Sequence, residues 1–187
     1  MFTLVVGGAA SGKSEYAEQL ILRAGALPRY YVATMEPFGA EARARIARHR
    51  VLRAQKRFET IECPVGLSRV LLPARGAALL ECLSNLAANE LYSPAGAGGE
   101  QAALAAVVDG VESLRRQCEA LVVVTGEVFS GGSAYAGDTG TYLRVLAAAN
   151  RALAARADAV CEVACGLPRY YKGCLLYTSP SPRDMRR

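Results

Sequence analysis

Short apolar runs and longer amphipathic stretches alternate along most of the chain. A short run of apolar, often β-branched residues is typical of a buried strand, whereas apolar residues that recur every three to four positions are typical of a helix. The strands predicted in this way cover residues 3–6, 29–34, 58–61, 77–81, 121–125 and 159–164. The predicted helices cover residues 13–24, 40–53, 83–91, 100–117 and 139–155. Because the two kinds of element alternate, we predict an α/β fold with a mostly parallel central sheet and helices on both of its faces.

The size and composition of the chain fit one globular domain. It has 187 residues, of which 52% are hydrophobic and 21% are charged, and a chain of this length can bury a full core. The glycine-rich residues 93–99 are predicted to form a surface loop, because neither flanking part is large enough for a separate domain. We expect a single domain over residues 1–173.

The sequence has no feature of a membrane or secreted protein. Its apolar runs are far shorter than the roughly 20 residues that a membrane span requires. A glycine loop begins at residue 7, which leaves no room for the basic and apolar regions of a secretory leader. The six cysteines include no Cys-x-x-Cys pair, which favours free thiols in a reducing compartment over a zinc site or disulfides. These features together predict a cytoplasmic protein.

Residues 174–187 differ in character from the rest of the chain. They have no helical or strand period and contain two Ser-Pro pairs, and they resemble the translated adapter tails of environmental gene sequences. We interpret them as a non-native, disordered tail. Without its three arginines and one aspartate the formal net charge falls from +5 to +3. A charge this small does not indicate a general surface for nucleic acid or membranes.

The loop after the first predicted strand has the pattern Gly-x4-Gly-Lys-Ser. It leads directly into the first predicted helix and consists of Gly7, Gly8, Ala9, Ala10, Ser11, Gly12, Lys13 and Ser14. In this context the backbone N–H groups of the loop surround a phosphate chain, and the helix contributes the positive end of its dipole. The Lys13 ammonium is expected to bind the β- and γ-phosphates, and the Ser14 hydroxyl to coordinate Mg²⁺. The pattern therefore predicts a nucleoside triphosphate site, with a plain strand-to-helix turn as the weaker alternative.

One acidic residue stands at the end of the fourth predicted strand. Glu81 follows the apolar residues 77–80, and in a parallel sheet the carboxyl ends of the strands form the ligand-binding edge. A magnesium ion that bridges phosphates needs a negative oxygen nearby. We predict that Glu81 supplies it together with Ser14, the alternative being an ordinary acidic residue at a helix start.

The predicted helix 40–53 holds the only histidine of the chain among several arginines. Arg45, His49 and Arg53 are spaced by four residues and so share one helical face. Guanidinium groups bind phosphate oxygens and keep a neighbouring imidazole neutral. The spacing favours His49 as a nucleophile toward phosphorus. A solvated arginine face, or a helix that contacts nucleic-acid phosphates, remains open as an alternative.

These motifs occur in the order typical of one enzyme family. The phosphate loop is followed by Tyr31-Val32-Ala33-Thr34, by Arg45-Ile46-Ala47-Arg48-His49-Arg50, by residues 58–64 and by Leu80-Glu81-Cys82-Leu83 with Asn85 and Asn89. Residues 1 to about 173 closely resemble the bifunctional adenosylcobinamide kinase / adenosylcobinamide-phosphate guanylyltransferase of cobalamin biosynthesis. The resemblance implies a three-layer P-loop NTPase fold of the RecA-like type and a homotrimeric assembly.

The resemblance also implies a reaction and a set of site residues. A transferase of this family phosphorylates adenosylcobinamide with ATP or GTP, and then takes GMP from GTP onto His49 and passes it to adenosylcobinamide phosphate. His49 and Lys13 are the implied catalytic residues, with Mg²⁺ as the implied cofactor. The implied nucleotide contacts are the loop from Gly7 to Ser14 together with Ala33, Thr34, Met35, Arg50, Val51, Leu52, Arg53, Glu62 and Glu81. Residues 129–135 are expected to cover the corrinoid.

Two other functions compete with this interpretation. One is a different small-molecule kinase in which His49 takes no part. The other is a nucleotide-gated nucleic-acid-binding module of the recombinase type, whose arginine helix contacts backbone phosphates. The modest net charge and the lack of an aromatic stacking platform count against the second. We therefore expect the corrinoid and nucleotides, and no nucleic acid, as partners.

Overall fold

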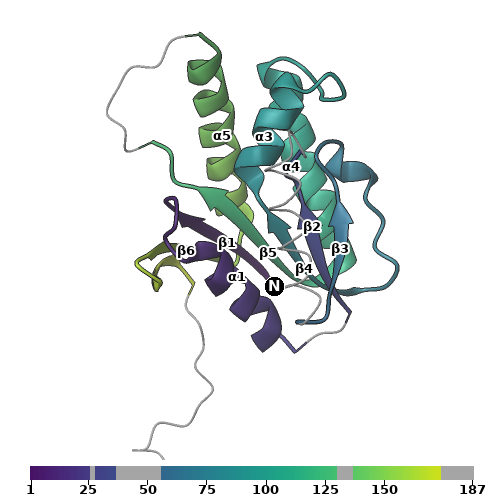
Figure 1. Ribbon diagram of the computed structural model, residues 1–187, viewed down its shortest axis with the longest axis vertical. Helices are drawn as coiled ribbons and strands as arrows, with labels where there is room; N and C mark the ends of the chain where they lie inside the picture. The colour runs from purple at the N-terminus through teal and green to yellow at the C-terminus, as the bar shows by residue number, and fades with distance from the viewer. Residues whose placement is uncertain (26–27, 37–55, 130–136, 174–187) are drawn as a thin grey trace, which may run out of the picture.

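Seven strands form one sheet that lies between two layers of helices. A computed structural model describes residues 1–25, 28–36, 56–129 and 137–173 of the chain. Helix α1 covers one face of the sheet, and α3, α4 and α5 cover the other (Figure 1). The predicted helix 40–53 lies outside the described residues, as do residues 174–187.

The elements follow the predicted order closely. The strands are β1 Phe2–Gly7, β2 Arg29–Ala33, β3 Phe58–Glu62, β4 Gly76–Glu81, β5 Cys118–Gly126, β6 Ala159–Ala164 and β7 Leu167–Lys172. The helices are α1 Lys13–Arg23, α3 Leu83–Tyr92, α4 Glu100–Gln117 and α5 Gly137–Arg156, with a short 3-10 turn, η1 Leu67–Arg69. Strand β7 and the turn η1 are additions to the predicted set.

The sheet has the strand order β3-β2-β4-β5-β1-β6-β7. All neighbouring pairs are parallel except β6 and β7, which form an antiparallel hairpin at one edge. In the register of β1 with β5, Gly7 stands beside Gly126, and in that of β2 with β4, Ala33 stands beside Glu81. The predicted α/β class with a mostly parallel sheet in three layers is confirmed.

Alternate residues of the central strands build two separate cores. On the α1 face, Val5 and Val122 pack with Ala17, Leu20 and Ile21 of the helix. The larger core on the other face joins the sheet to α3, α4 and α5. Because both faces are covered, the central strands are apolar nearly throughout, as expected for parallel strands.

The helices carry charges that suit their ends. In α1 an acidic Glu15 occupies the first turn and Arg23 the last, and in α4 Glu100 and Arg115 do the same. Charges of these signs interact favourably with the helix macrodipole and stabilise both helices. No helix in the described ranges combines the length and the apolar character that crossing a membrane requires.

The cysteines of the described residues form no disulfide. The free thiols are Cys63, Cys82, Cys118, Cys161 and Cys165. All but Cys82 and Cys165 are buried, and Cys165 is exposed at the turn between β6 and β7.

Candidate functional site

The phosphate loop connects β1 to α1 at the carboxyl edge of the sheet. Gly12 adopts a left-handed backbone with φ of 87° and forms the N-cap of α1, so that its carbonyl accepts the N–H of Tyr16 at 3.0 Å. The Lys13 ammonium folds back over the loop and donates to the Gly8 carbonyl at 3.0 Å. The helix N-terminus and the lysine are therefore both directed to the loop, as anion binding requires.

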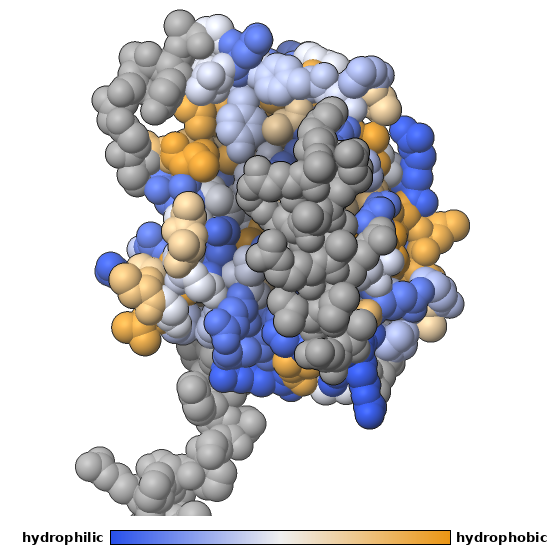
Figure 2. Space-filling view, in the orientation of Figure 1, coloured by the Kyte–Doolittle hydropathy of each residue, from blue (hydrophilic) through white to orange (hydrophobic). Residues whose placement is uncertain are grey.

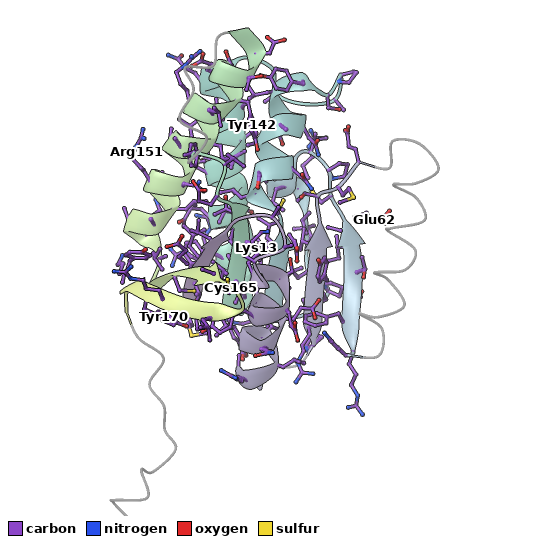
Figure 3. The ribbon with its side chains drawn as sticks, turned by 60° about the vertical axis from the view of Figure 1, so that its left-hand side comes forward. Lys13, Glu62, Tyr142, Arg151, Cys165 and Tyr170 are labelled. Atoms are coloured by element: carbon purple, nitrogen blue, oxygen red, sulfur yellow. The ribbon has the colours of Figure 1, made fainter. Side chains whose placement is uncertain are left out.

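The hairpin of β6 and β7 packs against this loop. Its two connecting residues, Cys165 and Gly166, both have positive φ, at 51° and 77°, which is the conformation of a type I′ turn. The Gly166 N–H donates to the Ser11 carbonyl at 2.8 Å. In Figure 3 the tip of the hairpin, labelled at Cys165, lies beside the start of α1, labelled at Lys13. The hairpin thus supports the phosphate loop from one side.

Two positions of the phosphate loop require glycine because the hairpin leaves no room for a Cβ there. A Cβ at Gly7 would lie 2.8 Å from the Val163 carbonyl, and one at Gly12 would lie 3.0 Å from the Gly166 Cα. A glycine in such a loop can also permit the close approach of a phosphate to the backbone. That reason fits Gly8, where an added Cβ would meet no protein atom within 4 Å.

The Glu81 carboxylate lies beside the start of α1. The Ser14 hydroxyl donates to Glu81 Oε1, and the Tyr31 hydroxyl donates to Glu81 Oε2 at 2.7 Å. Ser14, Tyr31 and Glu81 come from α1, β2 and β4, and the register of β2 and β4 brings the two strand ends side by side. The predicted pairing of Ser14 with Glu81 is thus present in the structure. Tyr31, which fixes the carboxylate, was not predicted as a site residue.

The paired oxygens of Ser14 and Glu81 suit a magnesium ion. Mg²⁺ in phosphoryl-transfer enzymes is held by one or two protein oxygens, with substrate phosphates and water completing its shell. Within the described residues no group of three or more His, Cys, Asp and Glu could form a protein cage for a metal. Ser14 and Glu81 therefore fit an ion that arrives with a nucleotide.

A second polar cluster joins the ends of β2 and β4. The buried Thr34 hydroxyl donates to the Cys82 carbonyl at 2.8 Å and accepts the Cys82 N–H at 2.7 Å. Burial raises the pKa of the Cys82 thiol, so that the thiol stays protonated near neutral pH. Ala33 and Thr34 lie next to Glu81, whereas the Met35 side chain is exposed. Two of the predicted nucleotide contacts, Ala33 and Thr34, therefore lie beside Glu81.

Glu62 is the remaining predicted nucleotide contact within the described residues, and it stands beside Ala33 in the register of β2 with β3. Glu62 ends β3, at the far side of the sheet in Figure 3. Four strand-to-strand steps separate β3 from β1, which corresponds to roughly 19 Å at the usual spacing. His49, Arg50, Val51, Leu52 and Arg53 lie outside the described residues.

The sequence from residue 3 to residue 170 matches the model of a protein family described as cobinamide kinase / cobinamide phosphate guanyltransferase. The chain belongs to this family. The resemblance seen in the motifs is thereby confirmed, and the cobinamide kinase / guanyltransferase family is one of transferases.

Characterised relatives match over nearly their whole length. The chain is 32% identical over 180 residues to the bifunctional adenosylcobalamin biosynthesis protein CobU of Salmonella typhimurium, covering 89% of this chain and 97% of the relative. It is 31% identical over 178 residues to the corresponding CobP protein of Pseudomonas aeruginosa, covering 92% and 98%. The chain therefore covers nearly the whole length of these two relatives.

Two solved structures are distant neighbours in shape. The RadB recombinase gives a TM-score of 0.45 at 18% identity, covering 86% of this chain and 73% of that structure. The flagellar accessory protein FlaH of Methanocaldococcus jannaschii gives a TM-score of 0.45 at 11% identity, covering 92% and 78%.

Proposed function

We propose that the chain phosphorylates adenosylcobinamide and then converts the product to adenosylcobinamide-GDP. In the first step the aminopropanol hydroxyl oxygen bonds to the γ-phosphorus of ATP or GTP. The bond to the β–γ bridging oxygen breaks, the nucleoside diphosphate leaves, and the hydroxyl proton passes to solvent. In the second step an oxygen of the new phosphate receives GMP derived from GTP. Family membership supports this reaction pair.

The observation that carries the proposal is the arrangement of Lys13, Ser14 and Glu81 around the phosphate loop. Lys13 holds the β- and γ-phosphates and stabilises charge that develops as the γ-phosphoryl group transfers. Ser14 and Glu81 would hold Mg²⁺, which neutralises charge on the phosphates. Tyr31 keeps one carboxylate oxygen occupied, and so directs the other toward Ser14.

We assign guanylyl transfer to His49. Its imidazole attacks the α-phosphorus of GTP, pyrophosphate leaves, and a guanylyl-histidine forms. A phosphate oxygen of adenosylcobinamide phosphate then displaces the imidazole. A covalent intermediate divides one difficult displacement into two easier ones. Ala33, Thr34, Met35, Arg50, Val51, Leu52, Arg53 and Glu62 are proposed to contact the nucleotide, on the basis of the family resemblance.

The exposed residues that follow β5 offer a surface for the corrinoid. The Glu127 N–H donates to the Gly7 carbonyl at 2.9 Å, which places the chain after β5 at the phosphate loop. Val128 and Phe129 are the next residues, and both are exposed. Hydrophobic residues are otherwise scattered in small groups over the face seen in Figure 2.

We propose a homotrimer in the cytoplasm, as the family resemblance implies.

The kinase step gives the test of this function. We expect Lys13→Ala to lower the rate of adenosylcobinamide phosphorylation on the order of 100-fold, as for other groups that stabilise transition-state charge. Lys56→Ala is the matched control, because Lys56 pairs with Glu18 on the surface and lies outside the site. A Lys13→Ala enzyme that phosphorylates at the wild-type rate contradicts the assignment, as does a wild-type chain without kinase activity.

A further inference from the structure

The residue that follows β5 lies beside the phosphate loop. The Glu127 N–H donates to the Gly7 carbonyl at 2.9 Å, which extends the pairing of β5 with β1 one residue beyond Gly126. The next carbonyl of the loop, that of Gly8, accepts the Lys13 ammonium at 3.0 Å. Because Lys13 is the group that binds the β- and γ-phosphates, Glu127 is attached to the loop near the reacting end of the nucleotide.

The backbone on both sides of Glu127 is fixed by hydrogen bonds. The Gly126 N–H donates to the Ser84 hydroxyl of α3 at 2.9 Å, and the Phe129 N–H donates to Glu127 Oε1 at 2.9 Å. A Cβ at Gly126 would lie 3.1 Å from the Ser84 Oγ, so a larger residue would crowd this anchor. Glu127 is itself half-buried. Its place at the loop is therefore set within the protein before any substrate binds.

Glu127 stands between the two proposed substrate surfaces. On one side is the phosphate loop, and on the other are the exposed hydrophobic side chains of Val128 and Phe129, the surface proposed for the corrinoid. Phosphoryl transfer requires the acceptor hydroxyl to lie in line with the γ-phosphate. The hydroxyl must therefore come between these two surfaces, where a carboxylate can accept its proton.

Three further acids near this edge have other partners or lie farther away. Both oxygens of Glu81 accept hydroxyl hydrogen bonds, and this carboxylate is assigned to Mg²⁺. Glu162 of β6, the other neighbour of β1, accepts the hydroxyl of Tyr171 on the edge strand β7 at 2.6 Å. Glu62 ends β3, four strand-to-strand steps from β1. Glu127 combines attachment to the loop with a place next to the acceptor surface.

We propose that Glu127 is the general base of the kinase step, an inference that deepens the proposed function and rests on it. As the acceptor oxygen bonds to the γ-phosphorus and the bond to the β–γ bridging oxygen breaks, the hydroxyl proton passes to the Glu127 carboxylate. The nucleoside diphosphate leaves with the electron pair of the broken bond, and the carboxylic acid then releases its proton to solvent. A positioned general base contributes on the order of 100- to 10,000-fold to a rate.

Guanylyl transfer has no need of this base. Its acceptor is an oxygen of adenosylcobinamide phosphate, and a phosphate monoester already carries negative charge at neutral pH. No proton has to be removed from the attacking oxygen. Loss of the Glu127 carboxylate should therefore slow the first step and spare the second, whereas a general loss of folding would slow both.

The test makes the same substitution near the two ends of β5. Glu127→Gln keeps the shape of the side chain and an oxygen that can accept the Phe129 N–H, but its amide takes up no proton near neutral pH. Glu127→Asp keeps a carboxylate on a side chain shorter by one methylene. Glu119→Gln is the matched control, because Glu119 is exposed near the amino end of β5, at the opposite edge of the sheet.

Two reactions are measured on each folded variant, with thermal melts to confirm folding. One gives kcat and KM for phosphorylation of adenosylcobinamide, and the other is the conversion of supplied adenosylcobinamide phosphate to adenosylcobinamide-GDP by GTP. We expect Glu127→Gln to lower the kinase kcat on the order of 100-fold or more, with the nucleotide KM and the second reaction close to wild type. Glu127→Asp should be faster than Glu127→Gln, and Glu119→Gln should match the wild type in both reactions.

The outcomes separate this inference from the proposed function. A wild-type kinase kcat in Glu127→Gln overturns the base assignment and leaves the proposed function intact. Equal losses in the two reactions also overturn it, because they indicate a merely structural role. So does a Glu127→Asp enzyme no faster than Glu127→Gln, because the carboxylate is then not the group that matters. A wild-type chain without kinase activity contradicts the proposed function itself.

Discussion

Gly12→Ala tests whether the β6–β7 hairpin supports the phosphate loop. An alanine at Gly12 keeps a backbone with φ of 87°, which costs about 1–2 kcal/mol for a residue with a Cβ. The new Cβ would also lie 3.0 Å from the Gly166 Cα. Displacing the turn to relieve this contact weakens the hydrogen bond from Gly166 to Ser11, worth about 0.5–1.5 kcal/mol. The substitution should therefore cost about 1.5–3.5 kcal/mol in the free energy of unfolding.

Gly25→Ala supplies the matched comparison. Gly25 has φ of 71°, and an added Cβ there would meet no atom within 4 Å. Gly25→Ala should lower the free energy of unfolding only by the strain of a left-handed backbone, about 1–2 kcal/mol. A third variant, Gly8→Ala, has neither positive φ nor a close neighbour and should stay within about 0.5 kcal/mol of the wild type.

Urea unfolding of the three variants gives the free energies directly. The account predicts the order Gly12→Ala, Gly25→Ala, Gly8→Ala from the largest loss to the smallest. Gly12→Ala should also lower the affinity for GTP, because the loop that binds the phosphates is displaced. A Gly12→Ala protein no less stable than Gly25→Ala would refute the role given to the hairpin.

Three further predictions concern other contacts of the structure. Tyr31→Phe removes the hydroxyl that orients Glu81. We expect this variant to bind Mn²⁺, used as a probe for magnesium, about 10-fold more weakly in the presence of nucleotide. Unchanged Mn²⁺ binding would contradict the orienting role. Cys165→Asn places the residue preferred in a type I′ turn before Gly166 and should stabilise the chain by about 0.5 kcal/mol or more in urea unfolding, so a destabilised variant would count against this turn type. Burial raises the pKa of the Cys118 thiol to about 12, above its value in the unfolded chain. Between pH 9 and 11 the unfolded chain therefore releases a proton that the folded chain keeps, and the free energy of unfolding falls as pH rises. Cys118→Ala should reduce this decline by about 1.4 kcal/mol per pH unit, and equal slopes in the two proteins would contradict the prediction.

Most of the fold was predictable because the apolar residues of most elements recur at the period of a helix or form the short run of a buried strand. The predicted strand 159–164 and helix 100–117 coincide with β6 and α4, and both have clear apolar patterns. Strand β7 was missed because it is an exposed edge strand with little apolar signal. Its turn is Cys165-Gly166, which lacks the Asn or Asp that usually marks a type I′ hairpin.

The candidate site was predictable where its chemistry is local in the sequence. Gly7 to Ser14 form a contiguous motif, and Glu81 directly follows four apolar strand residues. Tyr31 and Glu127 gain their roles from Glu81 and Gly7, partners that lie far away in the sequence. No spacing rule indicates such pairs before the strand order is known. The β2–β4 register is the fact that makes the Tyr31 contact evident.

The claim that His49 carries guanylyl transfer, while the phosphate loop carries the kinase step, is tested most directly by covalent labelling. The wild-type chain is incubated with Mg²⁺ and GTP labelled at the α-phosphate, and bound label is then challenged with acid and alkali. The account predicts a label that is lost in acid and kept in alkali, absent from His49→Asn, while His49→Asn still phosphorylates adenosylcobinamide. Label that persists on His49→Asn, or a wild-type chain that takes up none, would contradict it.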